Sequence, residues 1–231
     1  MREIVLDTET TGFDAHGSDR IVEIGCVELH NHMPTGKTYH QYIDPERSMP
    51  KEAFEVHGLG DDFLRGKPKF AEIGQAFLDF IGGDAKLVIH NASFDMKFLN
   101  AELKRARMPE LPWERALDTL AIARKKFPGS PSSLDALCRR YGIDNSNRTL
   151  HGALLDSEIL AEVYLELIGG RQPDLVLAPE RSAQSSAGSD ESWRPRPRPH
   201  PLDPRLTKEE AAAHDTFVKG IGDGALWRKF S

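Results

Sequence analysis

The stretch Leu6-Asp7-Thr8-Glu9-Thr10-Thr11-Gly12 decides how the rest of the chain is interpreted. Residues 3–8 are rich in aliphatic and β-branched side chains, which predicts a strand. Side chains alternate between the two faces of a strand, so Asp7 and Glu9 project from the same face. Burying two carboxylates side by side requires a neutralising cation or a protonated carboxyl group. The alternative is that the strand ends at Leu6 and that both acids are solvated loop residues.

Segments on the C-terminal side of this stretch predict the rest of the sheet. Residues 20–29 and 37–43 also read as strands, and short loops join all three, which favours an antiparallel meander. The later order of helix, strand at 86–90 and helix favours a parallel crossover. The expected fold class is therefore α/β, with a mixed sheet and helices on its faces. Helices are expected at 50–58, 70–81, from a Ser93 cap onward, 118–127, 133–141 and 153–168.

The composition is that of a soluble globular protein. The 231 residues carry a formal net charge of −6 and are 39% hydrophobic and 29% charged, which excludes wholesale disorder. Apolar runs are far shorter than the roughly 18 to 20 residues of a membrane span, and the first residues do not read as a signal peptide. A cytoplasmic protein without membrane contact is expected. Because the net charge repels nucleic acid, such a partner must be held by local basic patches or by metal ions.

The two cysteines, Cys26 and Cys138, each lie in an apolar pattern. That setting indicates two buried, reduced thiols rather than a disulfide or a zinc site.

The composition changes near residue 177. Residues 1–177 are expected to form one domain, with alternating strand and helix patterns. Residues 178–206 are rich in Ser, Pro and Arg, and the run 194–201 offers almost nothing to bury. Such a segment prefers extended geometry and predicts a semi-stiff linker.

A short tail, residues 207–231, follows the predicted linker. Its residues 207–210 have the pattern of a capping box, which predicts a helix that Gly220 and Gly222 end. Trp227 and Phe230 then lie in a segment too small to bury them, so a partner protein is expected to cover them.

Three further polar residues are candidates for a site. Asp95 is expected in the first turn of the helix after the strand at 86–90, where an Asp also simply stabilises a helix N-terminus. His151 precedes the helix at 153–168 and Asp156 lies in its second turn, so their side chains can converge on one point. Their apolar neighbours are unusual for a solvated pair, although a lone His there is more often structural.

Taken together, these residues predict a metal centre. Four carboxylates of one charge each, from Asp7, Glu9, Asp95 and Asp156, sum to −4, which two divalent cations cancel. Hard oxygen ligands select Mg²⁺ or Mn²⁺. Two such ions about 4 Å apart suit phosphodiester cleavage, because one activates a water and the other stabilises the leaving oxygen. With an unperturbed imidazole pKa of about 6.5, His151 is the natural general base for that water.

At these residues the sequence resembles a known family. Residues 6–12, 90–95 and 150–156 resemble the three exonuclease motifs of the DEDDh superfamily, and the likeness spans about residues 1–170. The stretches 133–138 and 148–151 are similar to the proofreading epsilon subunits of bacterial DNA polymerase III. The resemblance implies an RNase H-like fold with a mixed five-stranded sheet. It also implies a 3′→5′ exonuclease that hydrolyses the terminal phosphodiester of a DNA strand.

The resemblance also implies roles for individual residues. Asp7, Glu9 and Asp156 would ligate the metal ions and contact the substrate, Asp95 would complete the acidic set, and His151 would deprotonate the attacking water. Glu52 and His57 match positions that line the pocket for the terminal nucleotide in the family. The alternative for His57 is a polar residue that ends a short helix before a glycine.

Two partner segments are similar to those of the same family. Residues 172–177, from Gln172 to Leu177, resemble a peptide that binds the sliding clamp, although six-residue matches are common by chance. Residues 207–231 resemble the segment that docks on the catalytic (alpha) subunit of the polymerase, and Trp227 fits an aromatic anchor.

Other functions remain open from the sequence. An RNA-trimming exonuclease of the same superfamily would share the motifs, but it has no evident need for the linker and the tail. A structural bridge between polymerase and clamp would not need complete catalytic motifs. A glycosidase with two carboxylates does not explain four acids and a histidine.

Overall fold

The computed structural model describes residues 1–148, 150–170 and 206–221. These residues belong to two units, one up to residue 170 and one at 206–221. The clamp-like peptide at 172–177, nearly all of the predicted linker, and Gly222, Trp227 and Phe230 of the tail lie outside the described residues.

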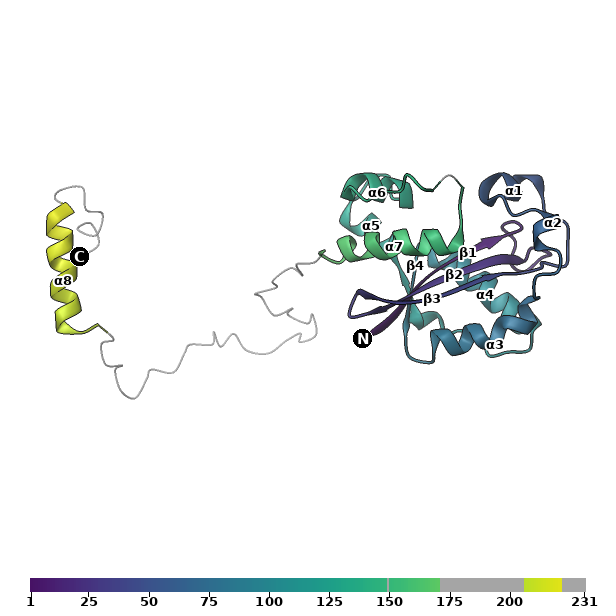
Figure 1. Ribbon diagram of the computed structural model, residues 1–231, viewed down its shortest axis with the longest axis horizontal. Coiled ribbons are helices and arrows are strands. Elements are labelled where there is room, and N and C mark those ends of the chain that lie inside the picture. Colours follow the sequence, from purple (N-terminus) through teal and green to yellow (C-terminus); the bar gives the residue numbers. More distant parts are fainter. Residues whose placement is uncertain (149, 171–205, 222–231) are drawn as a thin grey trace, which may run out of the picture. The chain divides into compact units, whose positions relative to one another are not determined.

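The larger unit is built on one mixed sheet of five strands in the order β3-β2-β1-β4-β5 (Figure 1). β1 pairs antiparallel with β2, and β2 pairs antiparallel with β3. β4 runs parallel to β1 and β5 runs parallel to β4. The predicted meander and crossover are both confirmed. The strands are β1 Arg2–Thr10, β2 Ile21–His30, β3 Met33–Tyr42, β4 Lys86–Ile89 and β5 Ala116–Asp118.

β1 is the central strand, and it does not end at Leu6. Its pairing with β2 continues past the acids, with Asp7 opposite Gly25 and Glu9 opposite Glu23. The solvated-loop alternative for Asp7 and Glu9 is therefore wrong, because both are ladder residues of the sheet. Strand alternation then places both carboxylates on one face.

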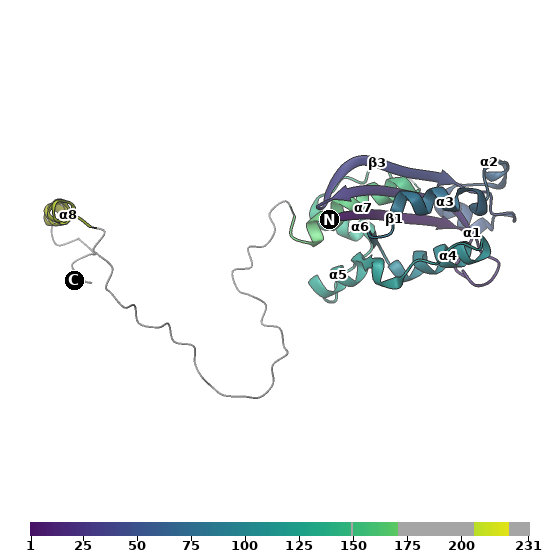
Figure 2. The ribbon, with the colours of Figure 1, turned by 90° about the horizontal axis from the view of Figure 1, so that it is seen from below.

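Helices cover both faces of the sheet (Figure 2). On one face, side chains of β1, β2 and β4 pack with those of α3 and α4, in a core that includes Leu6, Phe77 and Leu99. On the other face, α5, α6 and α7 pack around a second core that includes Val5 and Leu160. The helices are α1 Lys51–His57, α2 Asp61–Leu64, α3 Phe70–Ile81, α4 Ala92–Arg105, α5 Thr119–Lys126, α6 Leu134–Tyr141 and α7 Ala153–Leu167.

Two helix ends differ from the prediction. α4 begins at Ala92 without a side-chain cap, because Asn91 precedes it in the left-handed region at φ 68°. Asn tolerates that region better than most residues, so the chain can turn into the helix before Ser93. α8, Lys208–Ile221, runs through Gly220. Its predicted capping box is present, since the Glu210 backbone N–H donates to Thr207 Oγ1 at 3.2 Å and the Thr207 N–H donates to Glu210 Oε2 at 2.9 Å.

Two glycines allow the chain to approach or turn where the site is built. A Cβ on Gly25 would lie 2.2 Å from the backbone nitrogen of Leu154, so α7 can cross β2 this closely only over a glycine. The Ser157 hydroxyl donates to the Gly25 carbonyl oxygen at 2.9 Å, which fixes that crossing. Gly58 ends α1 in the left-handed region at φ 72°, as the sequence predicted. The crossing brings the N-terminal turns of α7 to the carboxylate-bearing face of β1.

Among the described residues, no helix has the length and apolar character that a membrane span needs. Cys26 and Cys138 are both buried and free, as predicted.

Candidate active site

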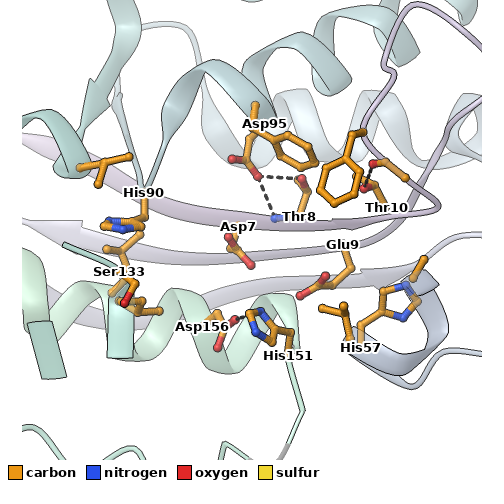
Figure 3. Close-up of a pocket in the computed structure, with 18 of the residues that line it drawn as sticks. Asp7, Thr8, Glu9, Thr10, His57, His90, Asp95, Ser133, His151 and Asp156 are labelled. Atoms are coloured by element: carbon orange, nitrogen blue, oxygen red, sulfur yellow. Dashed lines mark hydrogen bonds and ion pairs between the residues drawn. The ribbon is translucent and has the colours of Figure 1, made fainter. Parts of the chain in front are cut away.

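The predicted site residues line one open cleft of about 1210 Å³ at the C-terminal end of β1. Figure 3 shows Asp7 and Glu9 on β1 facing Asp156 and His151, with Asp95 on the opposite side of the strand. The cleft thus gathers side chains from segments far apart in the sequence. Its walls include all seven candidates: Asp7, Glu9, Glu52, His57, Asp95, His151 and Asp156.

The acids on β1 are held in an environment that opposes their charge. Burial, followed by the charges of Asp95, Glu9 and Asp156, raises the pKa of Asp7 well above its usual range. Burial and the neighbouring charges of Asp156 and Glu23 raise the pKa of Glu9 to about 8. The strand therefore presents more carboxylates than its surroundings can keep ionised at neutral pH, which is the condition that a bound cation relieves.

Asp95 is fixed to the middle of β1. Its Oδ1 accepts hydrogen bonds from the Thr8 backbone N–H at 3.1 Å and from the Thr8 hydroxyl at 2.7 Å. Its burial raises its pKa to about 7, against the opposing effect of these hydrogen bonds. Asp95 is therefore a buried member of the acid cluster, and it also lies in the first turn of α4.

Glu9, His151 and Asp156 offer ligand atoms that lie within 4.8 Å of one another. His151 Nδ1 is 3.5 Å from Asp156 Oδ2, and the two side chains are 48% and 4% exposed. The His151 backbone N–H donates to the Val56 carbonyl oxygen at 3.1 Å, which ties the loop before α7 to α1. Burial, with the nearby Arg148 charge, lowers the pKa of His151, so its imidazole is neutral at pH 7.

The donor set fits hard divalent cations. Carboxylate oxygens from β1 and α7 converge with one imidazole, no thiolate joins them among the described residues, and the spacing lies within reach of one ion. This chemistry matches Mg²⁺ or Mn²⁺ better than soft metals.

Arg148 was not predicted as a site residue, and its guanidinium lies inside the acid cluster. Its Nε donates to Asp156 Oδ1 at 2.5 Å and its Nη2 donates to Asp156 Oδ2 at 2.7 Å. Its Nη1 donates to Asp135 Oδ1 at 2.8 Å, and Nη2 is 3.0 Å from His151 Nδ1. In the sequence, Arg148 begins the stretch 148–151 that resembles the epsilon subunits and lies three residues before the predicted base. Neither observation determines where its side chain points.

Glu52 and His57 lie on α1 and line the cleft, and Figure 3 shows His57 beside Glu9. Glu52 is exposed, whereas His57 is 5% exposed and its Nδ1 accepts a hydrogen bond from the Leu59 backbone N–H at 3.0 Å. Burial lowers the pKa of His57. The ring of His57 therefore accepts a hydrogen bond just after the C-terminal end of α1 and also lines the cleft.

An aromatic pair at the cleft, exposed Phe13 and half-buried Phe94, was also not predicted. The Phe13 side chain is 90% exposed, and its ring meets that of Phe94 edge to face at 6.2 Å between centroids. Both rings line the cleft. An exposed aromatic ring beside carboxylates offers a face on which a nucleobase can stack.

Comparisons with known proteins agree on the family. The model of an exonuclease family matches residues 4–164. The DNA polymerase III subunit epsilon of Escherichia coli K12 is 48% identical over 238 residues, covering 98% of this chain and 97% of that protein. That of Rickettsia felis is 47% identical over 224 residues, covering 96% of this chain and 97% of that protein.

Solved structures resemble the larger unit. The match with Exonuclease X in complex with 5′ overhanging duplex DNA has a TM-score of 0.57 at 26% identity. The match covers 71% of this chain and 90% of that chain. The nuclease domain of 3′hExo, a DEDDh family member bound to rAMP, has a TM-score of 0.63 at 21% identity, covering 72% and 91%, and shows the fold alone.

Proposed function

The chain belongs to the family of DNA polymerase III epsilon subunits, and we propose which of its residues and segments carry the work of such a subunit. It is a metal-dependent 3′→5′ exonuclease that proofreads DNA as part of the polymerase. The observation that carries this conclusion is a match with epsilon subunits over nearly the whole length of both chains. A subunit of a bacterial DNA polymerase works where the DNA is, so the proposed location is the cytoplasm.

The proposed metal ligands are Asp7, Glu9 and Asp156, with Asp95 completing the acidic set. Their support is the convergence of oxygen donors in one cleft and the raised pKa values of Asp7 and Glu9, which mark an excess of negative charge. The proposed occupants are two divalent cations, Mg²⁺ or Mn²⁺. Bound there, such ions supply a polarised water and neutralise charge on the scissile phosphate and the leaving oxygen.

The proposed general base is His151. Its ring lies at the cleft, half exposed, and its lowered pKa keeps it neutral at pH 7, which a proton acceptor requires. Its backbone bond to Val56 positions the loop that carries it.

The proposed contacts with the 3′-terminal nucleotide are Glu52 and His57, together with the acids Asp7, Glu9 and Asp156. All five line the same cleft, so a terminal nucleotide held by Glu52 and His57 would present its phosphodiester to the acids.

The proposed partners use two other segments. Residues 207–231 would bind the polymerase alpha subunit, supported by the exposed apolar residues Phe217 and Ile221 of the described tail. Residues 172–177 would bind the sliding clamp. The proposed domains are 1–177 for the exonuclease, 178–206 for the linker and 207–231 for the polymerase-binding tail.

The experiment that tests the function compares a 3′-mispaired DNA primer with a short RNA, each with and without EDTA. We expect release of nucleoside 5′-monophosphates from the DNA primer, faster than from RNA, and none under EDTA. Cleavage that survives chelation would discard the metal mechanism, and a preference for RNA would favour the RNA-trimming alternative.

A further inference from the structure

Arg148 is a cation held inside the acid cluster. Its side chain is only 9% exposed, and its guanidinium nitrogens donate to Asp156 from Nε and Nη2 and to Asp135 from Nη1. Two of them form a bidentate pair with Asp156 and so engage both oxygens of that carboxylate. Bidentate pairs between Arg and a carboxylate are among the strongest that side chains make.

This guanidinium balances more than one acid. The hydrogen bond with Asp156 raises the pKa of Arg148, and the Arg148 charge opposes the upward shift of the pKa values of Asp7 and Glu9. Among the described residues lining the cleft, Arg124 is the other arginine, and no ion pair joins it to these acids. Arg148 is therefore the counter-charge around which the described cluster is organised.

We propose that Arg148 is a positioning residue that serves as the built-in counter-cation of Asp156 and leaves it when a divalent cation binds there. The inference rests on the metal-ligand role proposed above for Asp156. A guanidinium on both carboxylate oxygens and a divalent ion on the same group are like charges at contact distance, and they repel strongly in a site this buried. Asp135, whose side chain is 45% exposed, also holds the Nη1 of Arg148 and provides an anchor that is retained when Asp156 is released.

The exchange also acts on the proposed base. Arg has donors and no acceptor, so at the 3.0 Å contact the Nδ1 of His151 must be the acceptor. A neutral imidazole in that contact carries its proton on Nε2, which leaves neither ring nitrogen free to take a proton from water. When Arg148 leaves, the Nδ1 of His151 becomes free to accept a proton. Binding of the cation and activation of the proposed base are therefore coupled.

The first test measures Mn²⁺ affinity of the full chain by titration calorimetry. Arg148→Gln should bind Mn²⁺ at least about tenfold more tightly than the wild type, because no guanidinium has to be displaced. Arg139→Gln is the matched control, since it removes the same charge from an exposed position on α6, and its affinity should stay within about twofold of wild type. Affinity of Arg148→Gln that equals or falls below the wild-type value would overturn the proposal.

The second test uses the wild-type chain alone, so it does not depend on whether a variant folds. Nitrogen-15 NMR should show the Arg148 Nε proton protected in EDTA and exchanging rapidly with Mg²⁺, while His151 loses the signature of the Nε2-protonated tautomer. An Nε proton that stays protected at saturating Mg²⁺ would overturn the proposed exchange.

The variant Asp156→Asn separates this proposal from the proposed metal role of Asp156. Wild-type affinity for Mn²⁺ in that variant would refute the metal role of Asp156 itself.

Discussion

Replacing Glu9 by Gln should stabilise the protein in metal-free buffer while abolishing hydrolysis. Glu9 is 7% exposed and lies opposite Glu23 in the β1–β2 ladder, with Asp156 nearby. Gln has almost the same shape and carries no charge. The substitution therefore removes the cost of burying a charge, together with the repulsion by Asp156 and Glu23, and leaves the packing of β1 in place.

The size of the effect follows from the pKa of Glu9, which rises from the ordinary 4.5 to about 8. A raised pKa means that the folded state prefers the protonated carboxyl, so its contribution to stability is present below pH 4.5 and is lost as the pH rises towards 8. Each pH unit in that window costs about 1.4 kcal/mol, so the upper limit at pH 7 is about 3 kcal/mol. Because the neighbouring acids share the repulsion, we expect a gain of about 1 to 2 kcal/mol, which corresponds to a thermal midpoint higher by about 2 to 8 °C.

The assay is calorimetric unfolding in EDTA at pH 5 and pH 8. The thermal midpoint of the wild type should decrease from pH 5 to pH 8, and this decrease should be larger than that of Glu9→Gln. Glu52→Gln is the control, because it removes the same charge from an exposed residue of the same cleft. Equal pH dependence in the wild type and Glu9→Gln would refute the reasoning, as would a lower midpoint for Glu9→Gln at pH 8.

Three further predictions concern the pair, the base and the tail. Asp156→Asn should abolish hydrolysis and lower the metal-free thermal midpoint, because it leaves the guanidinium of Arg148 without its bidentate partner; an unchanged midpoint in calorimetry would contradict this. His151→Ala should slow hydrolysis by about 10² to 10⁴ and remove a pH–rate inflection that lies below the ordinary histidine pKa in the wild type; an inflection that persists would assign it to another group. Deleting residues 178–231 should leave cleavage of single-stranded DNA nearly intact and end stable binding of the polymerase alpha subunit in a pull-down, and Trp227→Ala should weaken that binding about 30-fold. Binding of the deleted chain as tight as that of the whole chain would refute the role of the tail.

Regular elements with a clear period were predictable from local sequence. The helix at Phe70–Ile81 has the bounds that its amphipathic spacing predicted, and the strands of the meander differ from prediction by only a few residues. β5 and α2, with three and four residues, were missed, because segments this short do not repeat their period often enough to form a pattern. α4 begins one residue before its predicted Ser93 cap because the backbone of Asn91 adopts a left-handed turn that periodicity does not encode.

For the site, the sequence by itself determined which residues could take part. Strand alternation placed Asp7 and Glu9 on one face, and positions at the starts of two predicted helices made Asp95, His151 and Asp156 candidates. The motif resemblance added Glu52 and His57. These inferences depend on chemical type and on spacing along a single element, both of which are written in the sequence.

Only the tertiary structure decided which charges touch. The Thr8 hydroxyl donates to Asp95, although the two residues are 87 positions apart in the chain. Glu23 lies opposite Glu9 only because two strands pair in one register. The contact between Arg148 and Asp156 spans only eight residues, but the approach of α7 to β2 over Gly25 brings that pair to the acids of β1. Electrostatic energies fall off with distance between atoms and not with separation along the chain, so the pKa values and the counter-charge of this site arise only when the sheet and its helices have packed.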